Sequence, residues 1–419
     1  MIPPGPPRDS CNSARRLLRR APRFASGTSG SIPLRRYRVE VWGCAWDVRP
    51  STATASISNG TLSGRRRRMS LTPFSLDELV DRFPRVRVAV VGDFFLDQYF
   101  VIDPGLAEPS VETGLTANQV VAIRHSPGAA GTVVNNLAAL DAGEIHAVGL
   151  VGDDGHGYLL RRELERRRVL TEALVPSDRR FTPTYTKPMF LRPGAAGAVE
   201  VEGERIDIVN RTPTPPDLED AVVRAVEAVA PRVDAVVVLD QVTRENVGVV
   251  TARVRRAICD VAKRLPGTLF YADSRGAIGE FVGLTTKPNE REALTAAGVG
   301  DPAAPSDEAA AEAGRRLFAR TGREVFLTRG ERGVLLTSRR GQCAIPAIPV
   351  DGPVDVCGAG DSATAGIVLS LCSGATPEQA ALVGNIVASK TVVQIGATGT
   401  TTRDAVRATP IDFLFAERG

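Results

Sequence analysis

From residue 86 onward, short apolar runs rich in β-branched residues alternate with longer segments of helical periodicity. Continuous apolar runs of this length are typical of strands buried on both faces of a parallel sheet. The runs are Val88–Val91, Ala147–Val151, Ala235–Leu239, Leu269–Ala272 and Val325–Thr328. The helical segments between them are Gly157–Arg168, Leu218–Ala230, Val247–Arg264 and Asp307–Thr321. This alternation predicts a doubly wound α/β sandwich around a mostly parallel sheet.

Length and composition fit one catalytic unit. The chain has 419 residues, of which 43% are hydrophobic, and α/β folds commonly exceed 250 residues as one domain. We expect one core with a small accessory sheet, because strand-like pieces at 110–123 and 185–192 interrupt the alternation. No apolar run reaches the ~18 residues of a membrane helix, so we expect a cytoplasmic protein without membrane contact.

The basic charge is concentrated in the first 70 residues. They hold fourteen Arg and three acidic residues, a net charge of +11 in a chain whose total is +4, so the remainder carries −7. The overall basicity therefore gives no reason to expect nucleic-acid binding by the folded body.

The same segment is rich in Ser, Pro and Gly, which predicts a disordered tail over residues 1–70 and a folded domain over 71–419. An Arg-rich, acid-poor leader also resembles an organellar transit peptide, but the prolines at 3, 4, 6 and 7 disfavour an amphipathic helix. A start codon placed too early is a third reading, because Met69 opens a segment that leads into a first helix. Disorder or misannotation is favoured.

The six cysteines, at positions 11, 44, 259, 343, 357 and 372, form no CxxC pair and have no His at metal-ligand spacing. We expect reduced thiols.

The strongest chemical signal is Gly358-Ala359-Gly360-Asp361, which precedes an apolar helical segment. Small residues at a helix start let backbone N–H groups bind a phosphate. Asp361 beside them would accept a proton from an attacking hydroxyl, while the amides stabilise the transferred phosphoryl group. The alternative is an ordinary helix N-terminus with an acid in its first turn.

This stretch closely resembles the second signature of the pfkB/ribokinase family of carbohydrate kinases, in which the Asp of a GAGD turn is the catalytic base. The resemblance extends from Val88 to about Arg407 and is greatest to the kinase domain of heptose-7-phosphate kinases of ADP-heptose synthesis. It implies a ribokinase-like three-layer sandwich with a small β lid, formed here by strands from about 100–127 and 183–210.

The resemblance also assigns roles near the amino end of the domain. Gly92-Asp93-Phe94-Phe95-Leu96-Asp97 is similar to the family's GDxxxD, in which Asp93 would bind sugar hydroxyls and Asp97 would support the site. Without the family resemblance, an Asp that directly follows a strand is most often a turn or cap residue. Lys187 falls where heptose kinases place a basic residue near the lid, although a surface Lys is an alternative.

Further motifs concern the metal and the nucleotide. Asn289 and Glu292 are similar to the NxxE motif that organises Mg²⁺ through water, and a capping box explains the same pair. Thr328, Gly330 and Gly333 match a TxGxxG turn that borders the nucleotide. The resemblance also implies nucleotide-binding roles for three other residues: Asp273, Arg275 and Asn385.

The acceptor half departs from the heptose kinases. Their Pro-Gly-Gly-Ala-Ala-Asn element is here Pro127-Gly128-Ala129-Ala130-Gly131-Thr132, so Gly128 is kept while the sugar-contacting Asn is replaced by Thr132. A Lys of their next loop is replaced by Thr243, unless Arg244 takes its place. No HxGH motif surrounds His125, His146 or His156, so we expect that nucleotide addition occurs elsewhere.

These features favour an ATP- and Mg²⁺-dependent sugar kinase with Asp361 as base and heptose 7-phosphate as leading acceptor. A kinase for another sugar phosphate or a nucleoside is the second reading, and a non-catalytic sugar- or nucleotide-binding regulator the third. Exposed lid edges favour a homodimer through the lid.

Overall fold

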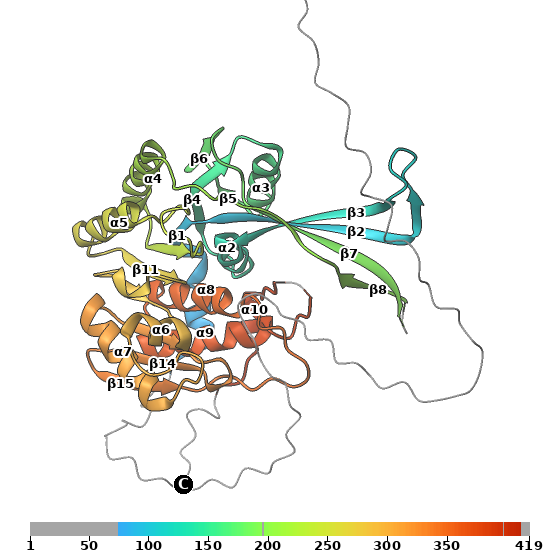
Figure 1. Ribbon diagram of the computed structural model, residues 1–419. Coiled ribbons are helices and arrows are strands. Elements are labelled where there is room, and N and C mark those ends of the chain that lie inside the picture. The colour runs from blue at the N-terminus through green and yellow to red at the C-terminus, as the bar shows by residue number, and fades with distance from the viewer. Residues whose placement is uncertain (1–73, 195–196, 397, 412–419) are drawn as a thin grey trace, which may run out of the picture. The chain divides into compact units, whose positions relative to one another are not determined.

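The central sheet has ten strands in the computed structural model, which describes residues 74–194, 197–396 and 398–411 (Figure 1). Its order is β15-β14-β13-β12-β11-β10-β1-β4-β5, with β6 paired to β4. All pairs are parallel except β13–β14 and β14–β15. The strands are β1 (Arg87–Gly92), β4 (Glu144–Gly152), β5 (Val169–Leu170), β6 (Leu174–Ser177), β10 (Ala235–Asp240), β11 (Leu269–Ser274), β12 (Thr285–Thr286), β13 (Val325–Thr328), β14 (Val334–Ser338) and β15 (Gly341–Ile345). The predicted fold class is confirmed.

Helices cover both faces of this sheet. The first face carries α1 (Leu76–Val80), α2 (Ala130–Ala139), α3 (Gly155–Glu165), α8 (Ala359–Cys372), α9 (Pro377–Thr391) and α10 (Arg403–Arg407). The second face carries α4 (Pro216–Val229), α5 (Ala252–Arg264), α6 (Glu290–Ala297) and α7 (Asp307–Thr321). Short 3-10 turns are η1 (Phe83–Arg85), η2 (Ala230–Arg232), η3 (Ile278–Glu280) and η4 (Gly330–Arg332).

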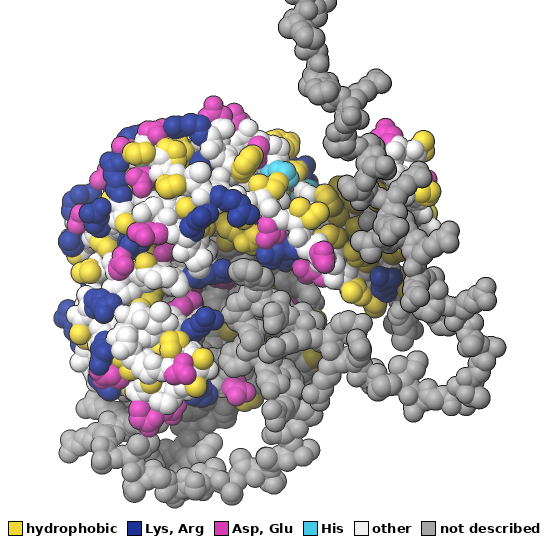
Figure 2. Space-filling view, in the orientation of Figure 1, with side chains coloured by type: hydrophobic (Ala, Val, Ile, Leu, Met, Phe, Trp, Pro, Cys, Tyr) yellow, Lys and Arg dark blue, Asp and Glu magenta, His cyan; other side chains and the backbone are white. Residues whose placement is uncertain are grey.

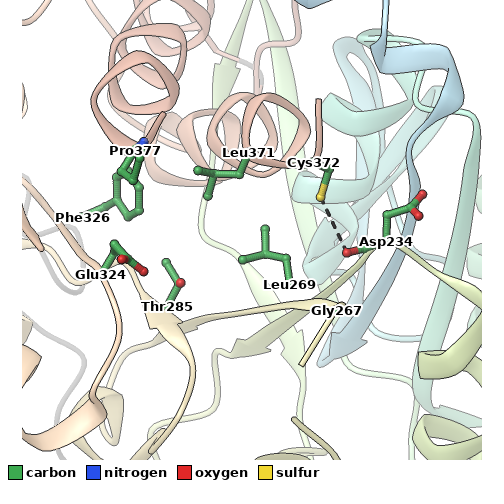
Figure 3. Close-up of a pocket in the computed structure, with 9 residues that line it drawn as sticks. All are labelled: Asp234, Gly267, Leu269, Thr285, Glu324, Phe326, Leu371, Cys372 and Pro377. Carbon is green, nitrogen blue, oxygen red and sulfur yellow. Dashed lines mark hydrogen bonds between the residues drawn. The ribbon is translucent and has the colours of Figure 1, made fainter. Parts of the chain in front are cut away.

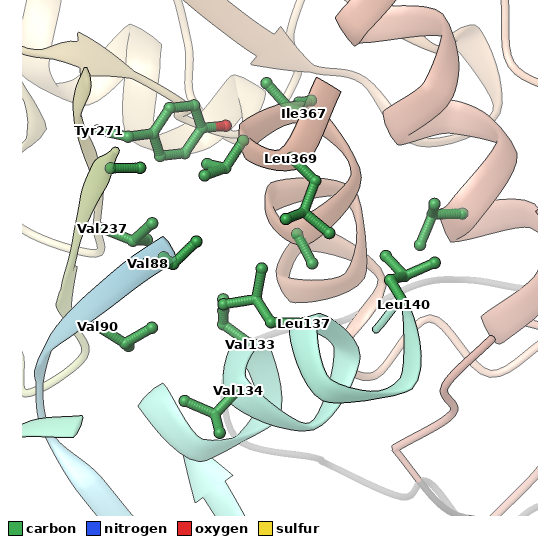
Figure 4. Close-up of a cluster of buried hydrophobic side chains, with 14 of the residues drawn as sticks. Val88, Val90, Val133, Val134, Leu137, Leu140, Val237, Tyr271, Ile367 and Leu369 are labelled. Carbon is green, nitrogen blue, oxygen red and sulfur yellow. The ribbon is translucent and has the colours of Figure 1, made fainter. Parts of the chain in front are cut away.

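Strand β1 shows why the sequence produces three layers. Val88 and Val90 pack into the core of the first face, whereas Ala89 and Val91 pack into that of the second. Successive strand residues point to opposite faces, so an unbroken apolar run satisfies two helical layers at once. Figure 4 shows Val88 and Val90 facing apolar side chains of α2, with Ile367 and Leu369 of α8 in the same cluster.

A second sheet forms the lid, in the order β3-β2-β7-β8 with β9 paired to β7. Its strands are β2 (Phe94–Pro109), β3 (Thr116–Ala129), β7 (Thr184–Gly194), β8 (Gly197–Glu202) and β9 (Ile206–Ile208). A single residue, Asp93, separates the end of β1 from the start of β2, so it forms the junction between the two sheets. β2 and β3 extend beyond the expected range of 100–127, because they begin at Phe94 and end at Ala129, whereas β7, β8 and β9 lie inside 183–210.

Helix α7 coincides with its predicted range, but α5 begins at Ala252 rather than Val247. The residues that precede Ala252 form a loop whose backbone groups make hydrogen bonds to side chains and backbone outside the helix. The carbonyls of Asn246, Val247 and Gly248 accept from Thr214, and the N–H of Val249 donates to Asp93. These tertiary hydrogen bonds compete with the helical ones.

The four cysteines within the described residues are free thiols, as expected; Cys11 and Cys44 lie outside them. The predictions for residues 1–70 also lie outside the described residues. Across the part of the chain that the structure describes, no helix is long and apolar enough to cross a membrane.

Candidate active site

Charged and polar side chains meet at the carboxyl edge of the central sheet. Asp93 follows β1, Asp240 ends β10, Asp273 lies near the end of β11, and Lys287 follows β12. The parallel register sets Leu239 opposite Asp273 and Ala272 opposite Thr286, so these ends are neighbours. Ligands of open α/β sheets bind at this edge.

The glycine turn opens α8 beside that edge. Gly358 has a φ of 77°, in the left-handed region that favours glycine. A Cβ atom placed on it would lie 2.6 Å from Cγ2 of Thr398 and 3.3 Å from Cγ2 of Thr132. The turn therefore requires glycine at position 358. The same distances show that Thr132, whose side chain is shorter than the Asn of heptose kinases, lies next to the turn. The N–H of Ala359 donates to the carbonyl of Val356 at 3.1 Å, whereas the next N–H groups, at Gly360 and Asp361, have no acceptor within the helix.

Asp361 is half-buried in the first turn of α8. Burial, followed by repulsion from Asp273, raises the pKa of Asp361 to about 7, against the lowering influence of Lys287 and Arg275. A carboxylate with this pKa can accept a proton near neutral pH more effectively than an ordinary Asp.

Lys287 is a buried cation for which no sequence motif predicted a role. Its side chain is 4% exposed, and Nζ lies 2.8 Å from Oδ2 of Asp273. A Cβ placed on Gly360 would lie only 3.2 Å from Nζ, so the ammonium group is against the glycine turn. Burial alone would lower the pKa of Lys287, but Asp273 raises it above its usual value. The ammonium group of Lys287 is thus held charged against the glycine turn.

Asn289 and Glu292 form a capping box at the start of α6. Oδ1 of Asn289 accepts from the N–H of Glu292 at 2.9 Å, and Oε2 of Glu292 accepts from the N–H of Asn289 at 2.8 Å. Burial, then Asp273, raises the pKa of Glu292 to about 7. Each oxygen keeps a lone pair for a water molecule. Within the described residues, no group of three His, Cys, Asp or Glu side chains is placed to hold a metal ion.

Three of the residues predicted to bind the nucleotide, Thr328, Gly330 and Gly333, lie at the β13–β14 turn. The N–H of Thr328 donates to the carbonyl of Pro288 at 2.9 Å, which joins this turn to the start of α6. Gly330 and Gly333 have φ values of 57° and 77°. A Cβ on Gly333 would lie 2.1 Å from the carbonyl oxygen of Ile345. Nδ2 of Asn385 donates to that same carbonyl and, at 2.8 Å, to that of Pro346, so Asn385 fastens the end of β15.

A cavity of about 260 Å³ lies at the carboxyl edge of the sheet, where Asp93 follows β1 and Gln241 follows β10. Its charged lining consists of one carboxylate, Asp93, and four arginines: Arg180, Arg211, Arg244 and Arg275. Arg275 also lowers the pKa of Asp361, so the charge that lines the cavity acts on this carboxyl group. Of these arginines, only Arg244 and Arg275 lie at positions that a sequence motif singles out. Arg180 and Arg211 lie in loops that no motif identifies.

Asp93 is in this cavity but is 4% exposed and heavily hydrogen-bonded. Oδ1 accepts from the N–H of Val249 at 2.7 Å, and Oδ2 accepts from the N–H groups of Gln241 and Val242 at 3.2 and 3.3 Å. Burial raises its pKa, and these backbone donors lower it. Asp93 therefore anchors the loop after β10, and this structural role does not depend on whether it binds a sugar hydroxyl.

Three other predicted acceptor residues meet at the base of the lid. A Cβ on Gly128 would lie 2.8 Å from Oδ2 of Asp97, so Gly128 admits that carboxylate. Lys187 lies 5.0 Å from the Tyr99 ring centroid. Burial raises the pKa of Asp97, and Lys187 lowers it. Lys187 also interacts electrostatically with Cys357, which immediately precedes the glycine turn.

A second cavity, of about 350 Å³, lies at the opposite edge of the sheet (Figure 3). It is lined by Leu269 and Thr285 at the beginnings of β11 and β12, and by Leu371 and Cys372 at the end of α8. None of the predicted site residues lines it.

A mostly parallel sheet, a glycine turn at a helix start and a carboxylate with a pKa near 7 define a phosphotransferase with an alcohol group as acceptor. The chain belongs to the pfkB family of carbohydrate kinases, which matches residues 98–403.

Among curated relatives, the "Bifunctional protein HldE" of Bradyrhizobium sp. (strain ORS 278) is 29% identical over 80% of this chain and 65% of that protein. The protein of the same name from Rhodopseudomonas palustris (strain TIE-1) is 31% identical over 72% of this chain and 59% of that protein. The chain thus spans less than two thirds of the length of these relatives.

Solved structures share the fold. Arabidopsis thaliana ribokinase complexed with ribose and ATP superposes with a TM-score of 0.56 at 18% identity, covering 78% of this chain and 99% of that one. Escherichia coli phosphofructokinase-2 in complex with substrates and products superposes with a TM-score of 0.58 at 17% identity, and the match covers 77% of this chain and 97% of that one.

Proposed function

We propose that this carbohydrate kinase transfers the γ-phosphate of ATP to a hydroxyl of a sugar phosphate. The leading acceptor is heptose 7-phosphate, which would give the 1,7-bisphosphate. The observation that carries the proposal is the convergence of three groups at one sheet edge. They are Asp361 with its pKa near 7, the charged Lys287 against the glycine turn, and the arginine-lined cavity.

In the proposed reaction, Asp361 accepts the proton of the acceptor hydroxyl as its oxygen bonds to the γ-phosphorus. The bond from that phosphorus to the β,γ-bridging oxygen breaks, and ADP leaves. The N–H groups at the start of α8 and the Lys287 ammonium stabilise the negative charge on the transferred group. Asn289 and Glu292 would hold Mg²⁺ through water, and the bound ion would supply further positive charge to the phosphate oxygens.

The charge of the cavity supports an anionic acceptor. Arg180 is buried and donates to the carbonyls of Thr212 and Val247. Arg211, Arg244 and Arg275 are exposed in the same lining. The carboxylate of Asp93 is already surrounded by N–H donors. Guanidinium groups bind phosphate through paired hydrogen bonds, so a phosphorylated sugar complements the cavity better than a neutral one.

A different sugar phosphate is the second candidate, favoured by the acceptor-side replacements. Thr132 cannot supply the paired donor and acceptor of an Asn side chain. Thr243 lines the cavity where heptose kinases have a Lys.

The test is phosphoryl transfer by the full chain from Mg²⁺-ATP to a panel of heptose, hexose and pentose phosphates, the free sugars, and nucleosides. Turnover confined to heptose 7-phosphate supports the leading acceptor, and turnover on another sugar phosphate supports the second. Arg211→Gln and Arg244→Gln are expected to raise KM for the acceptor but not for ATP. No turnover on any acceptor, with ATP still bound, would contradict the kinase assignment and favour a binding regulator.

We also propose that two copies pair through the lid. Val199 and Val201 of β8 are 48% and 49% exposed, and Ile123 of β3 and Ile206 of β9 are 55% and 65% exposed. Apolar side chains gather on the lid strands in Figure 2. Exposed apolar side chains on a sheet with open edges are typical of a strand-mediated interface.

A further inference from the structure

Two arginines of the β13–β14 turn join the starts of two helices. Nε of Arg329 lies 2.9 Å from Oε1 of Glu290, the first residue of α6, and its Nη2 contacts Asp307, the first residue of α7. Nη2 of Arg332 lies 2.6 Å from Oε2 of Glu290, and its Nη1 lies 3.2 Å from Oδ1 of Asp307. We call these four residues the turn network.

The turn network is partly withdrawn from water and internally neutral. The side chains of Arg329 and Glu290 are 9% and 11% exposed, whereas those of Arg332 and Asp307 are 42% and 41% exposed. Two guanidinium groups face two carboxylates, so the network is not itself an anion site. Burial alone would lower the pKa of Arg329, but its hydrogen bonds to Asp307 and Glu290 raise it. A buried pair of this kind is strongly directional.

Its position connects the proposed metal and nucleotide residues. Glu290 lies between Asn289 and Glu292 on the metal side, and Arg329 lies between Thr328 and Gly330 on the nucleotide side. Backbone contacts already join the bases of these elements, through Thr328 N–H to the Pro288 carbonyl and a parallel bridge between Asn289 and Thr328. The network extends this attachment to the tip of the turn.

We infer that Arg329 and Glu290 are positioning residues that hold the nucleotide-side turn and the start of α6 as one unit. ATP affinity and Mg²⁺ affinity are thereby coupled to the same ion pair. The inference rests on the proposed ATP-dependent reaction and adds residues that no motif of the family assigned. The acceptor cavity lies outside the unit, because none of the four residues lines it.

The test compares Arg329→Met, Glu290→Gln and the double variant with the parent chain. We expect KM for ATP and the Mg²⁺ concentration for half-maximal rate to rise about 5- to 20-fold in each single variant. We expect kcat and the acceptor KM to stay within about twofold. The double variant should lose less than the product of the single effects, since both changes remove one interaction. Arg264→Met, which breaks the exposed pair with Glu227, is the matched control and should leave both constants unchanged.

Nucleotide affinity is also measured without turnover, by calorimetry with a non-hydrolysable ATP analogue, and each variant is melted thermally. If Arg329→Met does not fold, Arg332→Gln at the more exposed end should show the same KM pattern with a smaller shift. A lowered melting temperature with unchanged KM for ATP and unchanged Mg²⁺ dependence overturns the inference. If the parent chain transfers phosphate and every variant keeps the parental affinity for the ATP analogue, the inference about Arg329 and Glu290 is wrong, whereas the proposed function stands. A parent that neither binds nucleotide nor transfers phosphate overturns both proposals.

Discussion

The ammonium group of Lys287 lies 2.8 Å from a carboxylate oxygen of Asp273, and both side chains are almost fully buried. Lys287 follows β12, and Asp273 lies in the neighbouring strand β11. The pair places a fixed positive charge against the glycine turn without leaving an uncompensated ion in the core. Removal of either partner would leave a buried charge alone, which costs more than the intact pair contributes.

Lys287→Met is therefore expected to lower the free energy of unfolding by about 3–5 kcal/mol, the usual cost of breaking a buried ion pair from one side. Denaturant titration measures it. Lys263→Met removes a Lys from an exposed pair with Asp260 and should leave stability unchanged, because solvent screens such pairs. Equal stability losses in the two variants would contradict this account of Lys287.

Asp361→Asn should lower kcat by roughly 10²- to 10⁴-fold, because the amide cannot accept the proton of the acceptor hydroxyl. Affinity for ATP should persist, since the backbone N–H groups of the turn remain. Steady-state kinetics and analogue binding separate the two effects. Parental turnover in the Asn variant would remove Asp361 from the catalytic role.

The pH profile should report the ionisation of Asp361. Its pKa is raised to about 7, so the carboxyl is mostly protonated below pH 7 and cannot act as a base. We expect kcat/KM for the acceptor to rise with pH and to level off above about pH 7. Arg275 lowers this pKa, so Arg275→Gln should move the rising limb to higher pH. A limb that stays in place, or that rises toward acid, would contradict the assignment.

Local patterns sufficed to predict the fold class and the glycine turn that opens α8. The central strands β1 and β10 are nearly continuous apolar runs because both of their faces are covered. The glycine turn is readable because only glycine tolerates the φ of Gly358 and the crowding by Thr398.

What the sequence could not reveal depends on residues distant along the chain. The N–H donors to Asp93 come from the loop after β10, about 150 residues away, and the same contacts delay the start of α5. Lys287 meets Asp273 only because β11 and β12 pair in register. The spacing of residues within one segment of the sequence therefore predicts neither the hydrogen bonds to Asp93 nor the Lys287–Asp273 ion pair.

Ala129 adopts a backbone conformation suited to glycine, with φ 52° and ψ −116° at the start of α2. Heptose kinases have glycine at this position, so the chain carries a methyl group where the backbone disfavours it. Ala129→Gly should raise the free energy of unfolding by about 1 kcal/mol, because the relieved strain exceeds the entropy that glycine adds to the unfolded chain. Ala138→Gly, inside the same helix, should instead destabilise by about 1 kcal/mol. Thermal melts of the two variants should shift in opposite directions, and a lower melting temperature for Ala129→Gly would contradict the strain.

The lid interface can be tested by charge. Val199 and Val201 lie two residues apart on β8 and share one face. The double variant Val199→Lys/Val201→Lys would bring like charges together across a two-fold interface and should convert a dimer into a monomer. Light scattering coupled to size-exclusion chromatography measures the mass. Val282→Lys replaces a residue that is 47% exposed outside the lid sheet and should leave the mass unchanged. A parent chain that is monomeric at micromolar concentration, or a dimer that survives the double change, would show that the exposed lid valines do not form the interface.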